Sequence, residues 1–460
     1  MERANLLLLC LSSSHLTPNP SRIKMNQPAG LSLDQAPPIT VPLRFFLSAP
    51  LFSMTAAILL LWQGPDMLTN RWHPALLGAT HMLTLGFLGL IMMGAVMQIL
   101  PVVAGTPVRR PLWAAGIIHT LGVTGIVLMC FGLVSSSPSP LRFSLPLLGS
   151  ALLAFSALVI FTLRRAQANN MTARAIRLAA VMLAATAILG LLLLSNHAYS
   201  WWLEIREPVT NLHLSWGLLG WVGVLVAGVA FQVVPMFQLT PAYPAFMTRW
   251  LAICLFLLLL ALSLGIIFPS LQLPLGLALA SALIWFAVTT LRLQNQRKRK
   301  LPDVTLSFWF GGMLCLLLAI ALWLAGRMIP LGENGQYELL LGLLMIVGFA
   351  MSLVNGMLYK IVPFLMWFHL QSRRKPGGPV VPNVKQILPE KRTRRQMWLH
   401  FAALASLLAA VLRPALFIYP AAVLFGASSL WLWLNMFSAW LTYRRIDALI
   451  VLSREAPSAA

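Results

Sequence analysis

Charged side chains are scarce in this sequence of 460 residues, and acidic ones are scarcer than basic ones. Charged residues make up 10% of the chain, with 33 Lys and Arg against 11 Asp and Glu, whereas hydrophobic residues make up 59%. A soluble globular domain carries about 25% charged residues. The composition therefore excludes an ordinary soluble domain and predicts an all-α polytopic membrane protein.

Cysteine is also scarce, and the motifs of several enzyme classes are missing. The four cysteines, Cys10, Cys130, Cys254 and Cys315, have no spacing that would indicate a disulfide framework or a zinc site. The sequence contains no P-loop, no nucleophile with an accompanying base and no paired carboxylates. Hydrolytic and phosphoryl-transfer chemistry are therefore not expected.

The net charge of +22 does not predict a nucleic-acid partner, because the basic residues lie in short loops between apolar runs. They cluster at Arg109–Arg110, Arg164–Arg165, Arg297–Lys300, Arg373–Lys375 and Lys391–Arg395. Loops held in the cytoplasm carry such an excess of Lys and Arg. We therefore expect the lipid bilayer, and no nucleic acid, as the partner of this basic chain.

Twelve apolar runs are long enough to cross a bilayer, which takes about 20 residues in a helix. They are residues 43–62, 76–101, 112–134, 143–163, 176–196, 210–236, 249–268, 273–292, 305–328, 337–366, 396–413 and 416–441. Residues 1–40, which are polar and rich in Pro and Ser, are expected to form a disordered tail. Residues 41–445 are expected to form the membrane domain, and residues 446–460 a C-terminal tail.

The loops also indicate how the runs cross the membrane. The basic clusters follow the even-numbered runs, whereas the acidic residues Asp66, Glu204, Glu207 and Glu333 follow odd-numbered ones. Both tails are therefore expected on the cytoplasmic side. The second, sixth and tenth runs would then cross from the outside to the inside.

These three runs share one pattern of glycine and proline. Counting back from Pro101, Pro235 and Pro363, glycine occurs at position −15 (Gly86, Gly220, Gly348) and at position −7 (Gly94, Gly228, Gly356). Position −3 holds Gln98, Gln232 and Lys360. Small residues let helices approach closely in lipid. Because the pattern recurs every four runs, we expect three parallel, pseudo-symmetric four-helix units at about residues 43–163, 176–292 and 305–441.

Histidines at the outer ends of these runs are the candidate site residues, because a polar side chain inside a bilayer is costly and often functional. His81 and His213 open two of the three repeats, and His73 and His197 lie at the outer ends of the second and fifth runs. Imidazole is a common metal ligand and an axial ligand of heme iron. We expect His81 and His213 to bind a cofactor and regard His73 and His197 as further metal-ligand candidates. The alternative for each is a hydrogen bond to a backbone carbonyl or a position at the membrane interface.

Together these features resemble subunit I of the heme–copper oxidases. The run from Thr80–His81 to Leu100–Pro101 and Gly105 is similar to the helix that binds the low-spin heme in that family. The run from His213 to Val234–Pro235 is similar to the segment whose histidine binds copper in the C-type oxidases, and Gly356–Met357–Leu358–Tyr359 is close to the family's Gly-Leu-Tyr-Tyr ending. The resemblance implies a cytochrome oxidase subunit I-like fold in a bacterial inner membrane, with heme and copper as candidate cofactors.

Several family ligands are replaced in this chain. Leu341 and Leu343 stand where the family has a His-X-His in its tenth helix, and the seventh run lacks the histidine pair that completes the copper site. Oxygen reduction at a heme–copper centre is therefore not expected. The second ligand opposite His81 stays open among Met345, Met351, His213 and an external ligand.

The chain is also similar to degenerate relatives of that superfamily, including the NnrS group, which is implicated in the nitric oxide response and in heme and copper binding. Thr80–His81 stands here where the NnrS group has a His-rich opening. We expect a heme- or copper-binding protein with a role in respiration or in the nitric oxide response. Its partners would be respiratory-chain or denitrification proteins. The alternatives are a secondary transporter of a metal, heme or small solute, and an assembly or structural subunit of an oxidase.

Overall fold

The structure, a computed structural model, describes residues 36–105, 108–165, 170–201, 206–298, 300–301, 303–329, 335–375 and 378–455. All regular structure in these ranges is helical, and twelve helical spans are long and apolar enough to cross a membrane. The chain is therefore a multi-pass membrane protein, which confirms the prediction from composition. Residues 1–35 of the expected tail lie outside the described residues, as do Glu204 and Glu333.

The first five spans begin and end close to the expected boundaries. They are α1 (Thr40–Gln63), the continuous helix α2 (Pro74–His81), η3 (Met82–Gly89) and α3 (Leu90–Ala104), then α4 (Pro111–Val134), α5 (Pro138–Leu163) and α6 (Met171–Tyr199). A short 3-10 turn, η2 (Gly64–Leu68), follows α1. Pro74, Pro111 and Pro138 occupy the first helical position, where the missing N–H costs nothing.

The remaining seven spans follow in the predicted order. They are α7 (Arg206–Ser215) with η4 (Trp216–Val224) and α8 (Leu225–Gln238), then α9 (Ala245–Ser263) with η5 (Leu264–Ile266), η6 (Pro269–Leu271) with α10 (Gln272–Asn295), α11 (Val304–Met328), α12 (Gln336–Leu343) with η7 (Leu344–Met351) and α13 (Ser352–Arg373), α15 (Glu390–Leu412) and α16 (Pro414–Glu455). The short helix α14 (Val384–Ile387) lies between α13 and α15.

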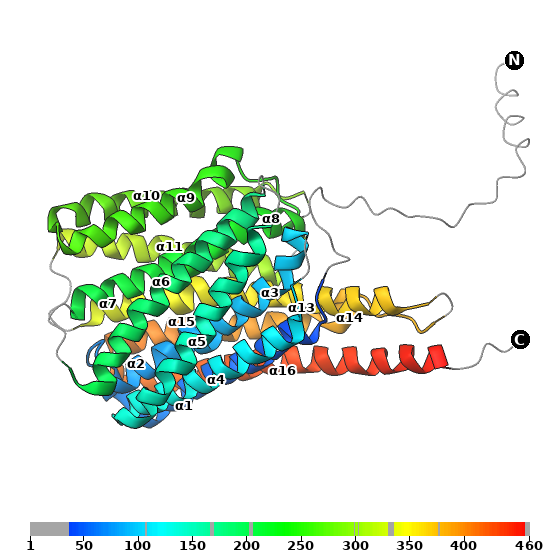
Figure 1. Cartoon of the computed structure of the whole chain (residues 1–460), viewed down its shortest axis with the longest axis horizontal. Coiled ribbons are helices and arrows are strands. Elements are labelled where there is room, and N and C mark those ends of the chain that lie inside the picture. The colour runs from blue at the N-terminus through cyan, green and yellow to red at the C-terminus, as the bar shows by residue number, and fades with distance from the viewer. Residues whose placement is uncertain are drawn as a thin grey trace, which may run out of the picture. The chain divides into compact units, whose positions relative to one another are not determined.

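The last helix is longer than the sequence indicated. α16 continues to Glu455, so residues 446–455, expected as part of a tail, are helical. This stretch contains no Pro or Gly to end the helix. Asp447 in this stretch forms an ion pair of 2.6 Å with Arg373 at the end of α13, and α16 extends past most other helices at this end of the bundle (Figure 1).

The three helices with the Gly–Gly–Pro pattern are the most buried spans. In the most apolar stretch of each, 72%, 67% and 67% of the residues are buried, against 56% or less in the other described spans. Segments η3 and η4 both contact η7, so the second and sixth spans meet the tenth span there. By contrast, only 28% of the residues are buried in the most apolar stretches of the spans that contain α9 and α10, which lie at one edge of the bundle (Figure 1). The patterned helices therefore form the interior of the bundle.

Each patterned helix also contains a π-helical segment in the same register. The segments η3, η4 and η7 begin at Met82, Trp216 and Leu344, each 19 residues before the proline of its helix. Hydrogen bonds from residue i to residue i+5 widen the helix there, and such segments frequently occur at functional sites. The sequence pattern did not reveal them, because it is compatible with a regular α-helix.

The repeated spacing of the glycines corresponds to close helix packing in the structure. A Cβ atom on Gly86 would lie 2.4 Å from Cγ of Phe52 in α1, and one on Gly228 would lie 2.2 Å from Cβ of Ala175 in α6. A Cβ atom on Gly356 would lie 2.8 Å from Cβ of Phe308 in α11. Each patterned helix is thus packed, through its glycines, against the helix that precedes it in the chain.

Candidate functional site

One large cavity lies among the N-terminal halves of the three patterned helices. Its volume is about 1010 Å³, at the upper end of the range of about 300–1,000 Å³ for ligand sites. Most of its lining is aliphatic. The titratable and polar side chains in its wall include His81, His213, Arg71, Glu207 and Arg327. The cavity is therefore suited to a large apolar ligand that is held by a few polar groups.

The two principal candidate histidines face each other in this cavity. The ring centroids of His81 and His213 are 6.2 Å apart, and their planes are inclined by 29°. His81 lies at the end of α2, directly before the π segment η3, and His213 lies in the last turn of α7, just before η4. The repeat thus brings together two side chains that are far apart in the sequence.

Hydrogen bonds to the backbone fix the tautomer of both rings. Nδ1 of His81 is 2.8 Å from the carbonyl oxygen of Leu77, and Nδ1 of His213 is 3.0 Å from that of Thr186. A carbonyl only accepts, so each Nδ1 carries the proton and donates it. Neither Nε2 atom has a hydrogen-bond partner among the described residues. The lone pair of each Nε2 atom is therefore available to a ligand.

Gly190 of α6 makes room for the ring of His213, and sequence reasoning missed it. A Cβ atom on Gly190 would lie 2.7 Å from Cε1 of His213. Gly190 stands within a run of leucines and belongs to no repeat column, so the sequence carried no signal for this role.

The tenth span contributes apolar residues to the same cavity. Leu341 and Leu343, the positions of the missing family ligands, both line it, together with Met345. A Cβ atom on Gly342 would have no neighbour within 4 Å, so this glycine borders open space. Met351, the other proposed ligand, is buried and does not line the cavity. Of the protein ligands considered for the place opposite His81, His213 and Met345 line the cavity.

His73 and His197, the further metal-ligand candidates, do not line this cavity. His73 precedes α2, and its buried Nδ1 has no hydrogen-bond partner among the described residues. His197 lies exposed in the last turn of α6. The structure therefore places neither side chain in the cavity wall.

The two imidazoles suit a ligand with two opposite coordination positions. A metal ion between two imidazole nitrogens separates the ring centroids by two bonds of about 2.0 Å plus the half-widths of both rings, which is roughly the observed separation. Within the described residues, no group of three or more His, Cys, Asp or Glu side chains could hold a metal ion. A two-nitrogen set fits the axial positions of a heme, or a two-coordinate copper ion, better than a tetrahedral zinc site.

An ion pair lies in the wall of the cavity. Nη2 of Arg71 is 2.9 Å from Oε1 of Glu207, and Nη1 of Arg71 donates to Oδ1 of Asn211 at 3.1 Å. These contacts join the loop before α2 to the first turns of α7. Arg71 also lies 4.7 Å from the ring centroid of Trp72, another residue of the cavity wall.

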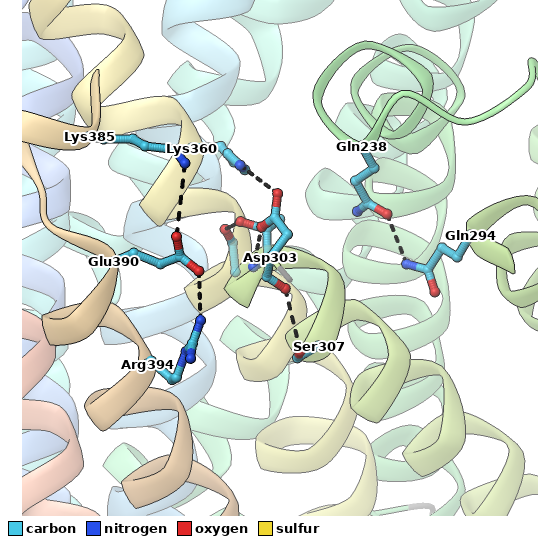
Figure 2. A network of polar contacts seen from close by, with 10 residues as sticks. Gln238, Gln294, Asp303, Ser307, Lys360, Lys385, Glu390 and Arg394 are labelled. Carbon is cyan, nitrogen blue, oxygen red and sulfur yellow. Dashed lines mark hydrogen bonds and ion pairs between the residues drawn. The ribbon is translucent and has the colours of Figure 1, made fainter. Parts of the chain in front are cut away.

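Polar contacts at the starts of α11 and α15 are separate from the cavity. Lys360 forms an ion pair of 2.6 Å with Asp303, and Glu390 lies between Lys385 and Arg394 (Figure 2). None of these residues lines the cavity. Lys360, at position −3 of its repeat, therefore holds α13 to the start of α11 and takes no part in the site.

A further histidine, His400 of α15, is buried away from the cavity. Its Nε2 is 2.8 Å from Oγ of Ser352, and its Nδ1 is 3.4 Å from Nδ2 of Asn355. One turn further along, Tyr359 donates to Gln396 at 3.0 Å. These contacts join α13 to α15, as cross-helix hydrogen bonds commonly do in membrane bundles.

No family model matches this chain, and no curated protein matches it in sequence.

Proposed function

We propose that this multi-pass membrane protein binds heme between His81 and His213 in the outer half of the bilayer. The observation that carries the proposal is the pair of rings, 6.2 Å apart in a cavity of about 1010 Å³. Both rings hold their protons on Nδ1, which leaves both Nε2 atoms for coordination. When bound, the heme would supply an iron centre for electron transfer or for a small ligand such as nitric oxide.

The proposal includes the architecture and the setting expected from the sequence. Three four-helix units around the three patterned helices would form an oxidase subunit I-like bundle in a bacterial inner membrane, with both termini in the cytoplasm. The shared π segments and the glycine contacts with α1, α6 and α11 support this arrangement. The role would be respiratory or part of a nitric oxide response, without reduction of oxygen, since leucines occupy positions 341 and 343.

The test is the heme content of purified protein and of histidine variants. The protein is expressed with a heme precursor in the medium, purified in mild detergent, and examined by reduced-minus-oxidised spectroscopy, heme extraction and metal analysis. We expect about one heme per chain in the wild type. His81→Ala and His213→Ala should each lose most of it, whereas the matched control His73→Ala, outside the cavity, should keep it.

Two outcomes would count against heme binding. A monodisperse preparation with neither heme nor copper, even after hemin is added, would overturn the proposal. Copper without heme, lost in His81→Ala and His213→Ala but kept in His73→Ala, would replace heme by a copper ion at the same pair of nitrogens.

A further inference from the structure

The start of α15 is fixed against α16 by two contacts that hold an arginine at the surface. Nε1 of Trp431 donates to the carbonyl oxygen of Arg392 at 3.2 Å, and Nη1 of Arg392 donates to Oγ of Ser438 at 3.1 Å. Arg392 is exposed, and among the described residues its guanidinium group forms no ion pair. A guanidinium group has five N–H donors, so most of those of Arg392 are available to a ligand.

Two further cations and a tryptophan lie on the same exposed part of α15. Lys391, Arg395 and Trp398 are spaced as residues i, i+4 and i+7, which places them on one face of the helix. All three are exposed, Trp398 to 66%. Within the described ranges, neither Lys391 nor Arg395 forms an ion pair or a side-chain hydrogen bond. We call Lys391, Arg392, Arg395 and Trp398 the basic face of α15.

The acidic side chains of α15 and of the adjoining part of α16 are paired with other cations. Glu390 lies 2.8 Å from Arg394 and 4.0 Å from Lys385 (Figure 2). Asp447 of α16 lies 2.6 Å from Arg373 of α13. The three cations of the basic face therefore carry an unbalanced positive charge, which attracts an anion.

The length of α15 places the basic face at the level of lipid headgroups. From Trp398 to Leu412 the helix carries no Asp, Glu, Lys or Arg, and Arg413 follows at its other end. The 21 residues from Arg392 to Arg413 span about 31 Å in a helix, close to the thickness of about 30 Å of a hydrocarbon core. Tryptophan is enriched at the boundary between hydrocarbon and headgroups, which is where Trp398 then lies.

We infer that the basic face of α15, together with Trp431 of α16, binds the headgroup of an anionic phospholipid. The guanidinium groups of Arg392 and Arg395 bind the phosphate, for which their planar fork of donors is suited. The exposed ring of Trp398 lies against the glycerol and the first part of the acyl chains. This site is independent of the proposed heme site, because none of these residues lines the histidine cavity.

The charge of the face selects among lipids. A zwitterionic headgroup such as phosphatidylcholine carries its own cation, which would lie beside the arginines and weaken the attraction. Phosphatidylglycerol has the same phosphate and no cation. Basic clusters between helices at the membrane surface bind anionic headgroups in this way. Phosphatidylglycerol is therefore the probe, and phosphatidylcholine with the same acyl chains is the comparison.

The experiment measures lipid binding to delipidated full-length protein in detergent by native mass spectrometry. Each lipid is titrated, and Kd is obtained for the first lipid bound. We expect wild type to bind phosphatidylglycerol at least about tenfold more tightly than phosphatidylcholine, since three cations contribute. Equal affinity for the two lipids overturns the inference. Displacement of phosphatidylglycerol by millimolar inorganic phosphate would replace the lipid by free phosphate as the ligand, and overturns it as well.

Variants assign the preference to the basic face. Lys391→Gln/Arg395→Gln removes two charges and no contact between described residues, so it should keep the thermal midpoint and lose most of the preference for phosphatidylglycerol. Trp398→Ala should weaken both lipids by a similar factor, because the ring contacts the part that they share. The matched control is Arg164→Gln/Arg165→Gln, an exposed basic pair that follows α5.

The remaining outcomes also decide the matter. An equal loss of preference in Arg164→Gln/Arg165→Gln would mean that net charge, and not this face, attracts the lipid, which overturns the inference. An unchanged preference in Lys391→Gln/Arg395→Gln overturns it too. Heme content should be the same in all of these variants and the wild type, so failure of the lipid site and failure of the heme site are measured separately.

Discussion

Gly190 and His213 are in contact at a distance that admits no side chain at position 190, because an added Cβ atom would lie 2.7 Å from Cε1 of the imidazole. This contact, together with the hydrogen bond from Nδ1 to the carbonyl of Thr186, sets the position of the ring. The glycine of one helix thereby determines where the histidine of the next helix lies relative to His81.

Gly190→Ala should therefore displace the His213 ring and weaken the proposed heme site. The steric cost of an extra methyl group in a packed interior is about 1–3 kcal/mol, unless the ring moves away. We expect the variant to fold, to bind hemin more weakly and to show a shifted Soret maximum. The control is Gly122→Ala, where the nearest neighbour of the new Cβ lies at 3.9 Å. A wild-type spectrum and affinity in Gly190→Ala would show that the position of this ring does not matter for binding.

Gly342→Leu should block the cavity without disturbing the fold. A Cβ atom there meets nothing within 4 Å, so the larger side chain enters the open space beside Leu341 and Leu343. We expect a thermal midpoint close to that of wild type and a large loss of bound heme. Gly342→Ala should retain most of the heme. If Gly342→Leu retains full heme occupancy, the ligand does not occupy this part of the cavity.

Gly228→Ala should destabilise the bundle through a clash between α8 and α6. The new Cβ would lie 2.2 Å from Cβ of Ala175, so the helices must separate, at a cost of about 1–3 kcal/mol. The double variant Gly228→Ala/Ala175→Gly removes one methyl group for the one added and should recover much of the loss. Thermal unfolding in detergent measures both effects. Additive losses in the double variant would contradict this account of the contact.

Lys360→Gln, which introduces the residue found at the same repeat position in the other two helices, should destabilise the packing of α13 against the start of α11. Lys360 and Asp303 are 2.6 Å apart, with 28% and 23% of their side chains exposed (Figure 2). We expect a loss of about 1–2 kcal/mol, between the values for exposed and buried ion pairs. Heme content should not change, since neither residue lines the cavity.

The double variant Lys360→Gln/Asp303→Asn separates the charge from the other role of Asp303. Asp303 also caps α11 by accepting a hydrogen bond of 2.9 Å from the backbone N–H of Thr305. Asparagine retains that cap but carries no charge. The double variant should therefore be more stable than Lys360→Gln alone. A double variant that is less stable would mean that the ion pair is not the source of the loss.

The sequence predicted the spans well and the details of the site less well. The order of the twelve spans follows from hydropathy, and the close helix packing at the glycine columns follows from the repeat. The choice of His81 and His213 as candidates came from their place in the repeat, and the structure brings these two together. The roles of Gly190 and Gly342 could not be predicted, because neither belongs to a repeat column and both depend on the neighbouring helix.

The sequence by itself determined that the described part of this chain contains twelve helices able to span a membrane, because a helix that crosses a bilayer must be long, apolar and hydrogen-bonded within itself. Only the tertiary structure decided that His213, and not Met351, lies across from His81, and that Leu341 and Leu343 share their cavity. The physical reason is that a π segment rotates the part of the helix that follows it about the helix axis, so that different side chains face the neighbouring helices. The contacts made by small residues then set which helix faces pack together.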